Sequence, residues 1–384
     1  MNEAKLMLTP CLGEEGAESR LIAGRRVMAI ESAVAVDPLW DRFLRANPLG
    51  QFQQSGLWAQ MKTREGWKLI RMVLSSDDGI VGGWQLLWKR SRLGLIGYVS
   101  KGPVVAGEDA EITAFALDRL ALVIEREGLR AVIVQPPDLA VRTPRWLADR
   151  GYQPDRIMNV IQTNLVVDVR AGMPEVERRM SHATRRKSRQ ARRKGTTVRE
   201  ATESEIATFF RLMLETCRRQ GEVRPNPSSV EALTEMWRVF HPAGCLRITL
   251  AECESKVVAG LLSIPFGRRM TLWKKGWNGE FGDHRPNELL TYEALEWAAR
   301  QGLSLCDFGS VDRGIAQALR EGKPLSSEHM ASRTFFNLGF GAEPMEIPEA
   351  MIGFASAGLR HAYKSIGWVP GLTKVLGKWV KRSA

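Results

Sequence analysis

The sequence has few of the residues and patterns from which cofactor-binding proteins and hydrolases are commonly recognised. Its five cysteines form no Cys-x-x-Cys pair and its five histidines form no suggestive pair, which argues against a zinc site and indicates reduced thiols. No GxxxxGK[ST] loop and no strand-associated GxGxxG occurs, so ATP and NAD are not expected. GxSxG and HExxH are also missing, which argues against common hydrolases. We expect neither a metal nor a bound cofactor.

Long apolar runs are absent as well. No run is long enough to span a bilayer, and Met1–Arg26 lacks the apolar core of a secretory signal. We therefore expect a cytoplasmic protein in which residues 1–26 form a flexible leader. The formal net charge of +12 favours an anionic partner, which can be a nucleic acid, a phosphorylated substrate or an anionic membrane surface.

The order of apolar segments predicts an α/β protein with two similar domains, over residues 27–160 and 161–345. In the first half, strand-like runs at 68–75, 80–88 and 93–100 predict an antiparallel meander. An amphipathic helix at 111–127, a Gly-Leu pair and a buried strand at 131–135 follow it. The second half repeats this order with strands at 246–252, 256–266 and 269–277, a helix from 287, the pair Gly302–Leu303 and a strand at 303–308.

The second of these helices and its strand carry the clearest local signals. Asn287 is placed to cap the helix, Glu296 and Arg300 are spaced for an ion pair, and Gly302 can end the helix in a left-handed conformation. The strand ends at Asp307, followed by Phe-Gly. A carboxylate at a strand end can belong to a site, but we favour a structural role for Asp307.

The C-terminal residues 346–384 mix apolar and basic side chains, and Pro370 divides them into two expected short helices. We favour a helical tail that docks onto the first domain. The alternative is a basic amphipathic helix that rests on anionic lipid, and so makes a peripheral contact with the membrane.

A basic segment provides the strongest charge feature. No acidic residue lies between Glu177 and Glu200. A helix over this segment would present an anion-binding surface of Arg185, Arg186, Arg189, Arg192 and Arg193. The alternative is a solvated surface without a ligand. Because no aromatic residue interleaves with the arginines, a phosphate backbone or a pyrophosphate fits better than stacked bases.

Six segments, taken in order, resemble the Fem aminoacyltransferases, the peptidyltransferases of peptidoglycan-bridge assembly. They are FQQSGLWAQMK with the following GW, YVSKGPV, ATRRKSRQARRKG, LETCRRQGEVRP, NELLTYEALEWAARQGLSLCDFGS and FFNLGFG, which together extend over about residues 50–345. The resemblance implies two tandem acetyltransferase-like (GNAT-like) domains with mixed, largely antiparallel sheets and a helical C-terminal tail.

The resemblance also implies an activity. An amine of a phosphorylated peptide or lipid-linked acceptor would attack the ester of an aminoacyl-tRNA, with no cofactor, at the inner face of the membrane or in the cytoplasm. Matching positions assign the acceptor phosphates to Lys62 and to one of Arg218, Arg219 and Arg224, and the peptide cleft to Tyr98 with Lys101 nearby. The arginines of the basic segment would bind the acceptor stem of the tRNA.

One departure from the family pattern concerns catalysis. Where the last motif has Phe-Lys in the family, this chain has Phe336-Asn337. The resemblance places these two residues at the oxyanion, where the amide of Asn337 can donate one hydrogen bond but supplies no charge. An N-acyltransferase that uses acyl-CoA or an acyl carrier protein is therefore an alternative, although the Arg/Gln-x-x-Gly-x-Gly/Ala turn typical of CoA sites is missing. A third reading is a non-catalytic RNA- or membrane-binding module.

Overall fold

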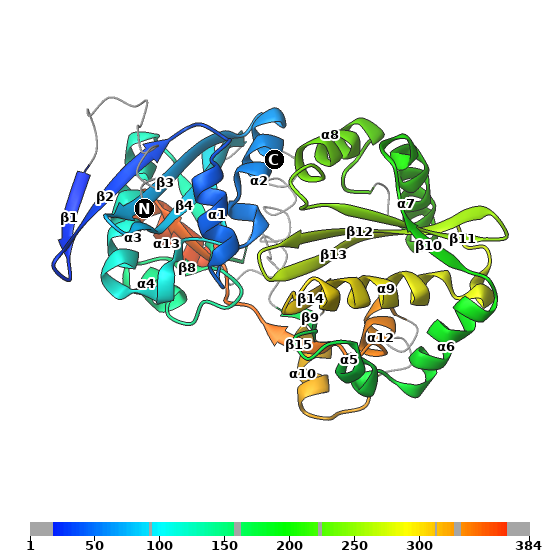
Figure 1. Ribbon diagram of the computed structural model, residues 1–384. Helices are drawn as coiled ribbons and strands as arrows, with labels where there is room; N and C mark the ends of the chain where they lie inside the picture. The colour runs from blue at the N-terminus through cyan, green and yellow to red at the C-terminus, as the bar shows by residue number, and fades with distance from the viewer. Residues whose placement is uncertain are drawn as a thin grey trace, which may run out of the picture.

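Two β-sheets, one for each half of the chain, organise the structure (Figure 1). The computed structural model describes residues 18–91, 94–156, 163–221, 225–311, 313–325 and 332–366. In the described strands, only β5 with β7 and β13 with β14 pair in parallel, and the other pairings are antiparallel. The prediction of an α/β fold with two acetyltransferase-like domains and largely antiparallel sheets is confirmed.

The first sheet has the strand order β1-β2-β3-β4-β5-β7-β16-β8, with β6 on β4. The predicted meander is its centre, since β3, β4 and β5 pair in sequence order. Trp84 of β4 and Phe115 of α3 are fully buried between this sheet and α3. The elements of this half are β1 (Glu18–Ile22), β2 (Arg25–Ser32), α1 (Pro38–Ala46), α2 (Gly56–Arg64), β3 (Lys68–Ser76), β4 (Gly79–Ser91), β5 (Gly94–Ser100), β6 (Val104–Val105), α3 (Ala110–Arg126), β7 (Ala131–Gln135), α4 (Thr143–Asp149) and β8 (Gln153–Pro154).

The second sheet has the strand order β10-β11-β12-β13-β14-β9-β15. Figure 1 shows α7 and α8 on one face of this sheet and α9 on the other. Leu290, Ala294 and Ala298 form an apolar stripe on α9 and are buried against the sheet. The elements are β9 (Thr163–Asp168), α5 (Met173–Arg179), α6 (His182–Arg193), β10 (Thr197–Glu200), α7 (Ile206–Gln220), α8 (Val230–Phe240), β11 (Arg247–Cys253), β12 (Lys256–Phe266), β13 (Arg269–Trp277), α9 (Pro286–Arg300), β14 (Leu305–Ser310), α10 (Arg313–Arg320), α12 (Arg333–Leu338) and β15 (Glu343–Glu346).

Most helix ends follow from local side-chain chemistry. Ser55 caps α2, because its side chain accepts a hydrogen bond from the amide of Trp58 at 3.2 Å. At the end of α9, Gly302 has φ +68° as predicted, and Glu296 pairs with Arg300 at 3.4 Å. The prediction that Asn287 caps α9 is wrong. The helix already starts at Pro286, whose fixed φ suits the first helical position.

Both ends of the chain differ from their predictions. The prediction of a flexible leader is wrong for residues 18–26, because β1 pairs with β2 from Glu18 onward. The tail is not wholly helical, since Met351–Phe354 forms β16, which pairs with β7 and β8 of the first sheet. α13 (Ala357–Ile366) follows it. The favoured prediction, that the tail docks onto the first domain, is confirmed for these residues, whereas residues 367–384 and the expected domain boundary at 160/161 lie outside the described ones.

A hydrophobic core continuous between the two halves joins them. Trp40 and Phe52 from the first half are buried in one cluster with Phe209, Trp237 and Phe240 from α7 and α8. The first half therefore supports the face of the second sheet that carries α7 and α8. Within the described residues, no helix has both the length and the apolar character needed to cross a membrane.

Docking of the C-terminal strand can be tested at Gly353. A Cβ atom there would fall 2.6 Å from the ring of Tyr152, whereas one at Gly358 in α13 would meet nothing within 4 Å. We expect Gly353→Ala to lower the free energy of unfolding by about 1–3 kcal/mol through overpacking. Gly358→Ala is expected to raise it by about 0.5–1 kcal/mol. Urea unfolding measures both, and equal effects of the two variants would contradict the docking.

Candidate active site

A cavity opens in the second sheet where two parallel strands stop pairing. β13 and β14 are paired only at Arg269–Leu305, Met270–Cys306 and Thr271–Asp307. Beyond the last pair, the register of β13 with β12 shifts between Leu262 and Ser263, which is the signature of a bulge. The residues that follow on both strands line a cavity of about 320 Å³. Its walls include Leu272–Lys275 of β13, Phe308–Ser310 of β14, Met213, Thr216, Cys217 and Gln220 of α7, and Arg333 and Asn337 of α12.

Asn337 lies where the family motif predicted a catalytic group. It is 4% exposed, and its Oδ1 has no hydrogen-bond partner among the described residues. An unsatisfied polar atom in a buried wall is costly unless a ligand pairs with it. Phe336 does not line the cavity, because its ring packs on Phe340 with centroids 5.3 Å apart. The catalytic roles of both residues stay predictions.

Lys275 is a cavity residue that the sequence interpretation missed. It lies near the end of β13, and its Nζ donates to Thr291 Oγ1 of α9 at 3.0 Å. Burial lowers the pKa of Lys275 to about 7, with the charge of Arg333 acting in the same direction and that of Glu288 opposing it. The adjacent lysines in Thr271-Leu-Trp-Lys-Lys were the available signal, because lysine is depleted in strands.

Asp307 is close to the cavity but does not line it. It is 4% exposed, and its carboxylate accepts from Asn164 Nδ2 and from the amide of Gly309, both at 2.8 Å. Burial raises the pKa of Asp307, and Arg269, 3.6 Å away, opposes that shift. This placement agrees with the structural role predicted for Asp307.

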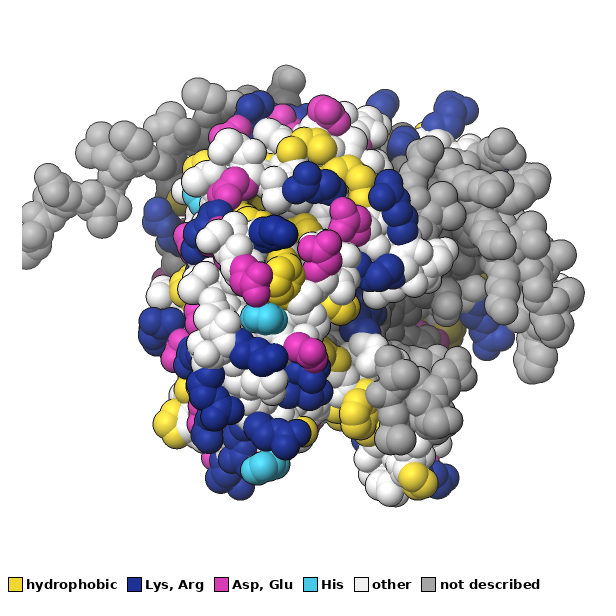
Figure 2. All heavy atoms as spheres, turned by 90° about the vertical axis from the view of Figure 1, so that its right-hand side faces the viewer, with side chains coloured by type: hydrophobic (Ala, Val, Ile, Leu, Met, Phe, Trp, Pro, Cys, Tyr) yellow, Lys and Arg dark blue, Asp and Glu magenta, His cyan; other side chains and the backbone are white. Residues whose placement is uncertain are grey.

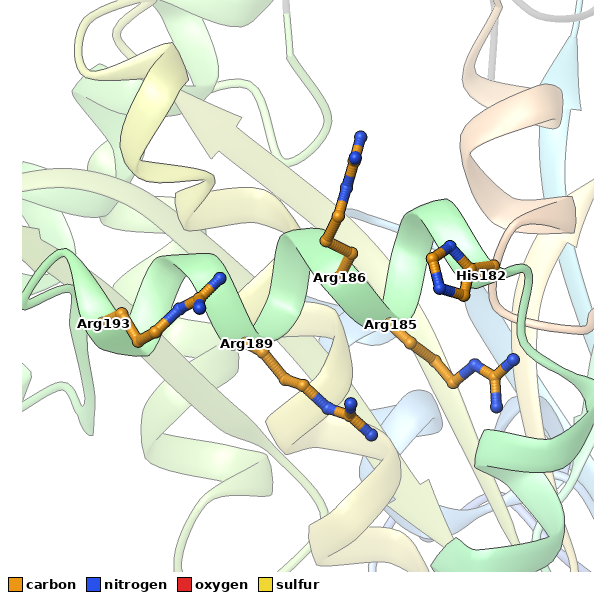
Figure 3. A pocket seen from close by; sticks show the side chains of 5 residues that line it. All are labelled: His182, Arg185, Arg186, Arg189 and Arg193. Atoms are coloured by element: carbon orange, nitrogen blue, oxygen red, sulfur yellow. The ribbon is translucent and has the colours of Figure 1, made fainter.

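The basic helix α6 gathers four of its five predicted arginines on one surface. Arg185, Arg186, Arg189 and Arg193 line an open hollow of about 540 Å³ together with His182 (Figure 3). In Figure 3, Arg185 and Arg189 extend from one side of the helix and Arg186 from the other. Figure 2 shows Lys and Arg side chains gathered over the lower part of this face of the molecule.

Arg192 departs from the predicted arrangement. It turns toward α9, where its guanidinium lies 3.3 Å from Glu293 and 4.9 Å from the ring centroid of Tyr292. Arg192 does not line the hollow, because the carboxylates of α9 offer it partners, but it is exposed and its anion-binding role stays a prediction. Arg189 stays exposed, although Glu177 lies 4.0 Å away.

The structure does not bring the predicted acceptor-phosphate residues into contact with one another. Lys62 of α2 pairs with Glu65 at 2.6 Å and lies over the ring of Trp58. Arg219 of α7 lies over the ring of Trp277 and reaches Thr216 at 3.4 Å. Arg218 is exposed on the same helix, and Arg224 lies outside the described residues. Their role in substrate binding stays a prediction.

Two further predicted substrate residues have internal partners. Tyr98 donates to Gln135 Oε1 at 2.8 Å and packs against an apolar cluster that contains Ile133 of β7 and Ile352 of β16. Burial raises the pKa of Tyr98 to about 12. Lys101 is 6% exposed and pairs with Asp138. The predicted contacts of Tyr98 and Lys101 with a peptide find no support in these positions, because both polar groups already have protein partners.

The ion pair of Lys101 belongs to a buried cluster between the two domains. Asp138 also pairs with Arg269, the first residue of β13, and exchanges two hydrogen bonds of 3.0 Å with Gln51. Burial alone would raise the pKa of Asp138, but Lys101 and Arg269 outweigh it, so the pKa lies below its ordinary value. Asp138 thereby fixes the start of the strand whose later residues line the cavity. Among the described residues, no group of three His, Cys, Asp or Glu side chains is arranged to hold a metal.

Comparison with known proteins agrees with this division of the chain. Residues 38–143 match the FemAB family, and residues 178–314 match the acetyltransferase (GNAT) domain. The lipid II:glycine glycyltransferase of Staphylococcus saprophyticus is 28% identical over 242 residues, which cover 60% of this chain but only 57% of that protein. The UDP-N-acetylmuramoylpentapeptide-lysine N(6)-alanyltransferase of Weissella viridescens is 25% identical over 293 residues, covering 71% of this chain and 83% of that protein.

Solved structures show the same fold. The crystal structure of FemX superposes with a TM-score of 0.75 at 18% identity, over 88% of this chain and 99% of that one. A tandem GNAT protein from the clavulanic acid biosynthesis pathway has a TM-score of 0.50 at 12% identity and covers 86% of this chain and 99% of its own. The fold and its cavity thus define a tandem GNAT-like protein. Within that class, the chain is related to the Fem-type aminoacyltransferases, as its motifs predicted.

The buried cluster at the domain junction gives a testable stability effect. Asp138→Asn leaves Lys101 and Arg269 without their counter-charge, so we expect a loss of about 3–5 kcal/mol in the free energy of unfolding at pH 7. The pKa of Asp138 in the folded protein lies below its ordinary value of 3.8. The stabilisation that the ionised carboxylate provides is therefore fully present above pH 3.8 and is lost as the pH falls through the folded-state pKa. The difference between wild type and variant should therefore shrink in acid.

The exposed pair of Arg25 and Asp78 provides a matched control. Both side chains are more than 70% exposed, so Asp78→Asn should change stability by no more than about 0.5 kcal/mol at either pH. Urea unfolding at neutral and acid pH measures the free energy of unfolding of wild type, Asp138→Asn and Asp78→Asn. A loss in Asp138→Asn that is the same at both pH values would contradict the assigned ion pairs.

Proposed function

We propose that this protein is an aminoacyltransferase that takes an aminoacyl group from aminoacyl-tRNA and joins it to an amine of a phosphorylated cell-wall-precursor peptide, nucleotide- or lipid-linked. The observation that carries the proposal is the cavity between β13 and β14, which Asn337 lines with a buried carbonyl oxygen that has no partner among the described residues. A deep cavity in the second domain suits the acyl end of a donor. The named relatives transfer glycine or alanine to lipid II or to a UDP-linked muramoyl pentapeptide, which supports an acceptor of that kind.

The chemistry needs positioning and charge stabilisation rather than a cofactor. The neutral amine of the acceptor attacks the ester carbonyl carbon, and the carbonyl electron pair moves to oxygen. When the tetrahedral intermediate collapses, the C–O ester bond breaks and the amine proton passes to the departing ribose oxygen. The protein can accelerate this by holding both substrates in the second-domain cavity and at its mouth, and by stabilising the oxyanion.

The arginine surface of α6 supports tRNA as the donor. Four arginines in an open hollow can contact successive phosphates, whereas the CoA-type turn is missing from the sequence. We expect the cytoplasmic side of the membrane as the place of action, with residues 346–384 as the candidate for a peripheral membrane contact.

A transfer assay distinguishes the three functions considered for this sequence: tRNA-dependent aminoacyl transfer, N-acyl transfer from CoA or a carrier protein, and non-catalytic binding. Wild type is incubated with tRNA charged with a labelled amino acid and with UDP-linked or lipid-linked muramoyl peptide, with and without ribonuclease. Label in the peptide that ribonuclease abolishes supports the proposal. Transfer from acyl-CoA or acyl carrier protein that ribonuclease leaves unchanged supports the N-acyltransferase. Salt-dependent tRNA binding with no transfer from any donor supports the non-catalytic module.

The arginine surface of α6 leads to a second testable prediction, which concerns tRNA binding. The double substitution Arg185→Ala with Arg189→Ala should weaken tRNA binding, and the slope of log affinity against log salt should become shallower by about 0.7–0.9 for each phosphate that the protein no longer neutralises. Arg25→Ala is the control, because Arg25 is an exposed arginine of the first domain. Filter binding over a range of salt concentrations measures the slope. An unchanged slope in the double variant would exclude this surface from the tRNA site.

A further inference from the structure

The cavity between β13 and β14 contains an ammonium group at a place that the family motif does not assign. The resemblance implies a lysine at the position of Asn337 on α12, and this chain has none there. Lys275 instead enters the same cavity from β13. Asn337 of α12 and Lys275 of β13 thus line different walls of one cavity, and Arg333 lies on the same helix as Asn337.

Three contacts fix the position of Lys275. Its Nζ donates to Thr291 Oγ1, which in turn donates to the carbonyl of Asn287 at 2.8 Å, so the Thr291 hydroxyl is oriented to accept from the lysine. The ammonium also lies 4.5 Å from the ring centroid of Phe336 and 5.7 Å from that of Phe308. Phe336, which packs outside the cavity, therefore contributes to it by holding this cation.

The charge of Lys275 lacks a counter-ion. In the described part of the chain, no carboxylate lies within ion-pair distance of it, and Glu288 of α9 pairs with Lys187 at 3.7 Å. Thr291 uses one of the three N–H groups of the ammonium, so others can face a ligand. Burial lowers the pKa of this lysine to about 7, because the ammonium loses hydration and no ion pair compensates for it; a bound anion would raise the pKa again.

We propose that Lys275 is the catalytic cation of this protein and holds the oxyanion of the tetrahedral intermediate, in place of a lysine at position 337. The inference rests on the proposed acyl transfer. As the acceptor amine bonds to the carbonyl carbon, the displaced electron pair settles on the carbonyl oxygen beside the Lys275 ammonium. Collapse of the intermediate returns the pair to the carbon, breaks the ester bond and leaves the ammonium unchanged.

This arrangement favours the transition state over the bound ester. A neutral carbonyl gains little from a nearby cation, but an oxyanion in a site shielded from water gains much more, because the effective dielectric constant is low. Removal of one preorganised oxyanion donor typically slows acyl transfer by about 10²–10³-fold. We therefore expect Lys275→Met to slow single-turnover transfer by about 10²–10³-fold while tRNA affinity stays within about threefold of wild type.

A variant that carries the lysine on α12 instead of β13 tests the assignment more sharply than Lys275→Met alone. Asn337→Lys in the Lys275→Met background places an ammonium in the same cavity from the opposite wall and should recover at least about tenfold of the lost rate. Lys256→Met is the matched control, since Lys256 is the exposed first residue of β12, and it should transfer at the wild-type rate. Wild-type transfer by Lys275→Met, or a double variant as slow as the single one, would overturn the assignment.

Binding of substrate analogues separates this inference from the proposed function. The probes are an adenosine bearing a 3′-aminoacyl phosphonate, which mimics the anionic tetrahedral intermediate, and one bearing a 3′-aminoacyl amide, which mimics the neutral ester. Lys275→Met should weaken phosphonate binding at least about thirtyfold and amide binding less than about threefold. Equal weakening of both overturns the role of Lys275. Absence of transfer by wild type, with either analogue result, refutes the proposed function instead.

Discussion

The end of parallel pairing between β13 and β14 is the constraint on which the candidate site depends. The strands are joined as far as Thr271 and Asp307, and beyond that point each needs another partner for its backbone. Asp307 supplies one, because its carboxylate accepts from the amide of Gly309, a residue with φ +86°. The pair of strands can therefore separate without leaving that amide unsatisfied, and the space between them becomes the cavity. Asp307 shapes the site without entering it.

The first domain controls the same strand from its other end. Arg269 is the first residue of β13 and pairs with Asp138, which follows β7 of the first domain. Trp40 and Phe52 add apolar contacts to α7 and α8, and α7 forms another wall of the cavity. An ion pair and a hydrophobic core thus hold two walls of the cavity against the first domain. This explains how a sheet without cavity residues can still contribute to the geometry of the site.

The sequence predicted those features that depend on residues close together in the chain. The Gly302 stop, the Glu296–Arg300 pair and the strands of both meanders were predicted from local patterns and are present. β16 was missed because its four residues carry no periodicity of their own and pair with β7, more than 200 positions away. Lys275 was missed because a lysine in a strand normally indicates a solvent-facing position. The partners of Arg192 were not predicted, because the carboxylates with which it pairs belong to another helix.

Helix α9 connects the arginine surface to the cavity. Glu288 and Glu293 pair with Lys187 and Arg192 of α6, whereas Thr291, between them in sequence, orients Lys275 in the cavity. Residues three apart in an α-helix are separated by only about 4.5 Å along its axis. A rigid helix therefore sets the distance between the surface proposed for the tRNA stem and the cation proposed for its ester. A donor bound at both places would contact α6 and β13, which are both tied to α9, and this favours a fixed orientation of the carbonyl.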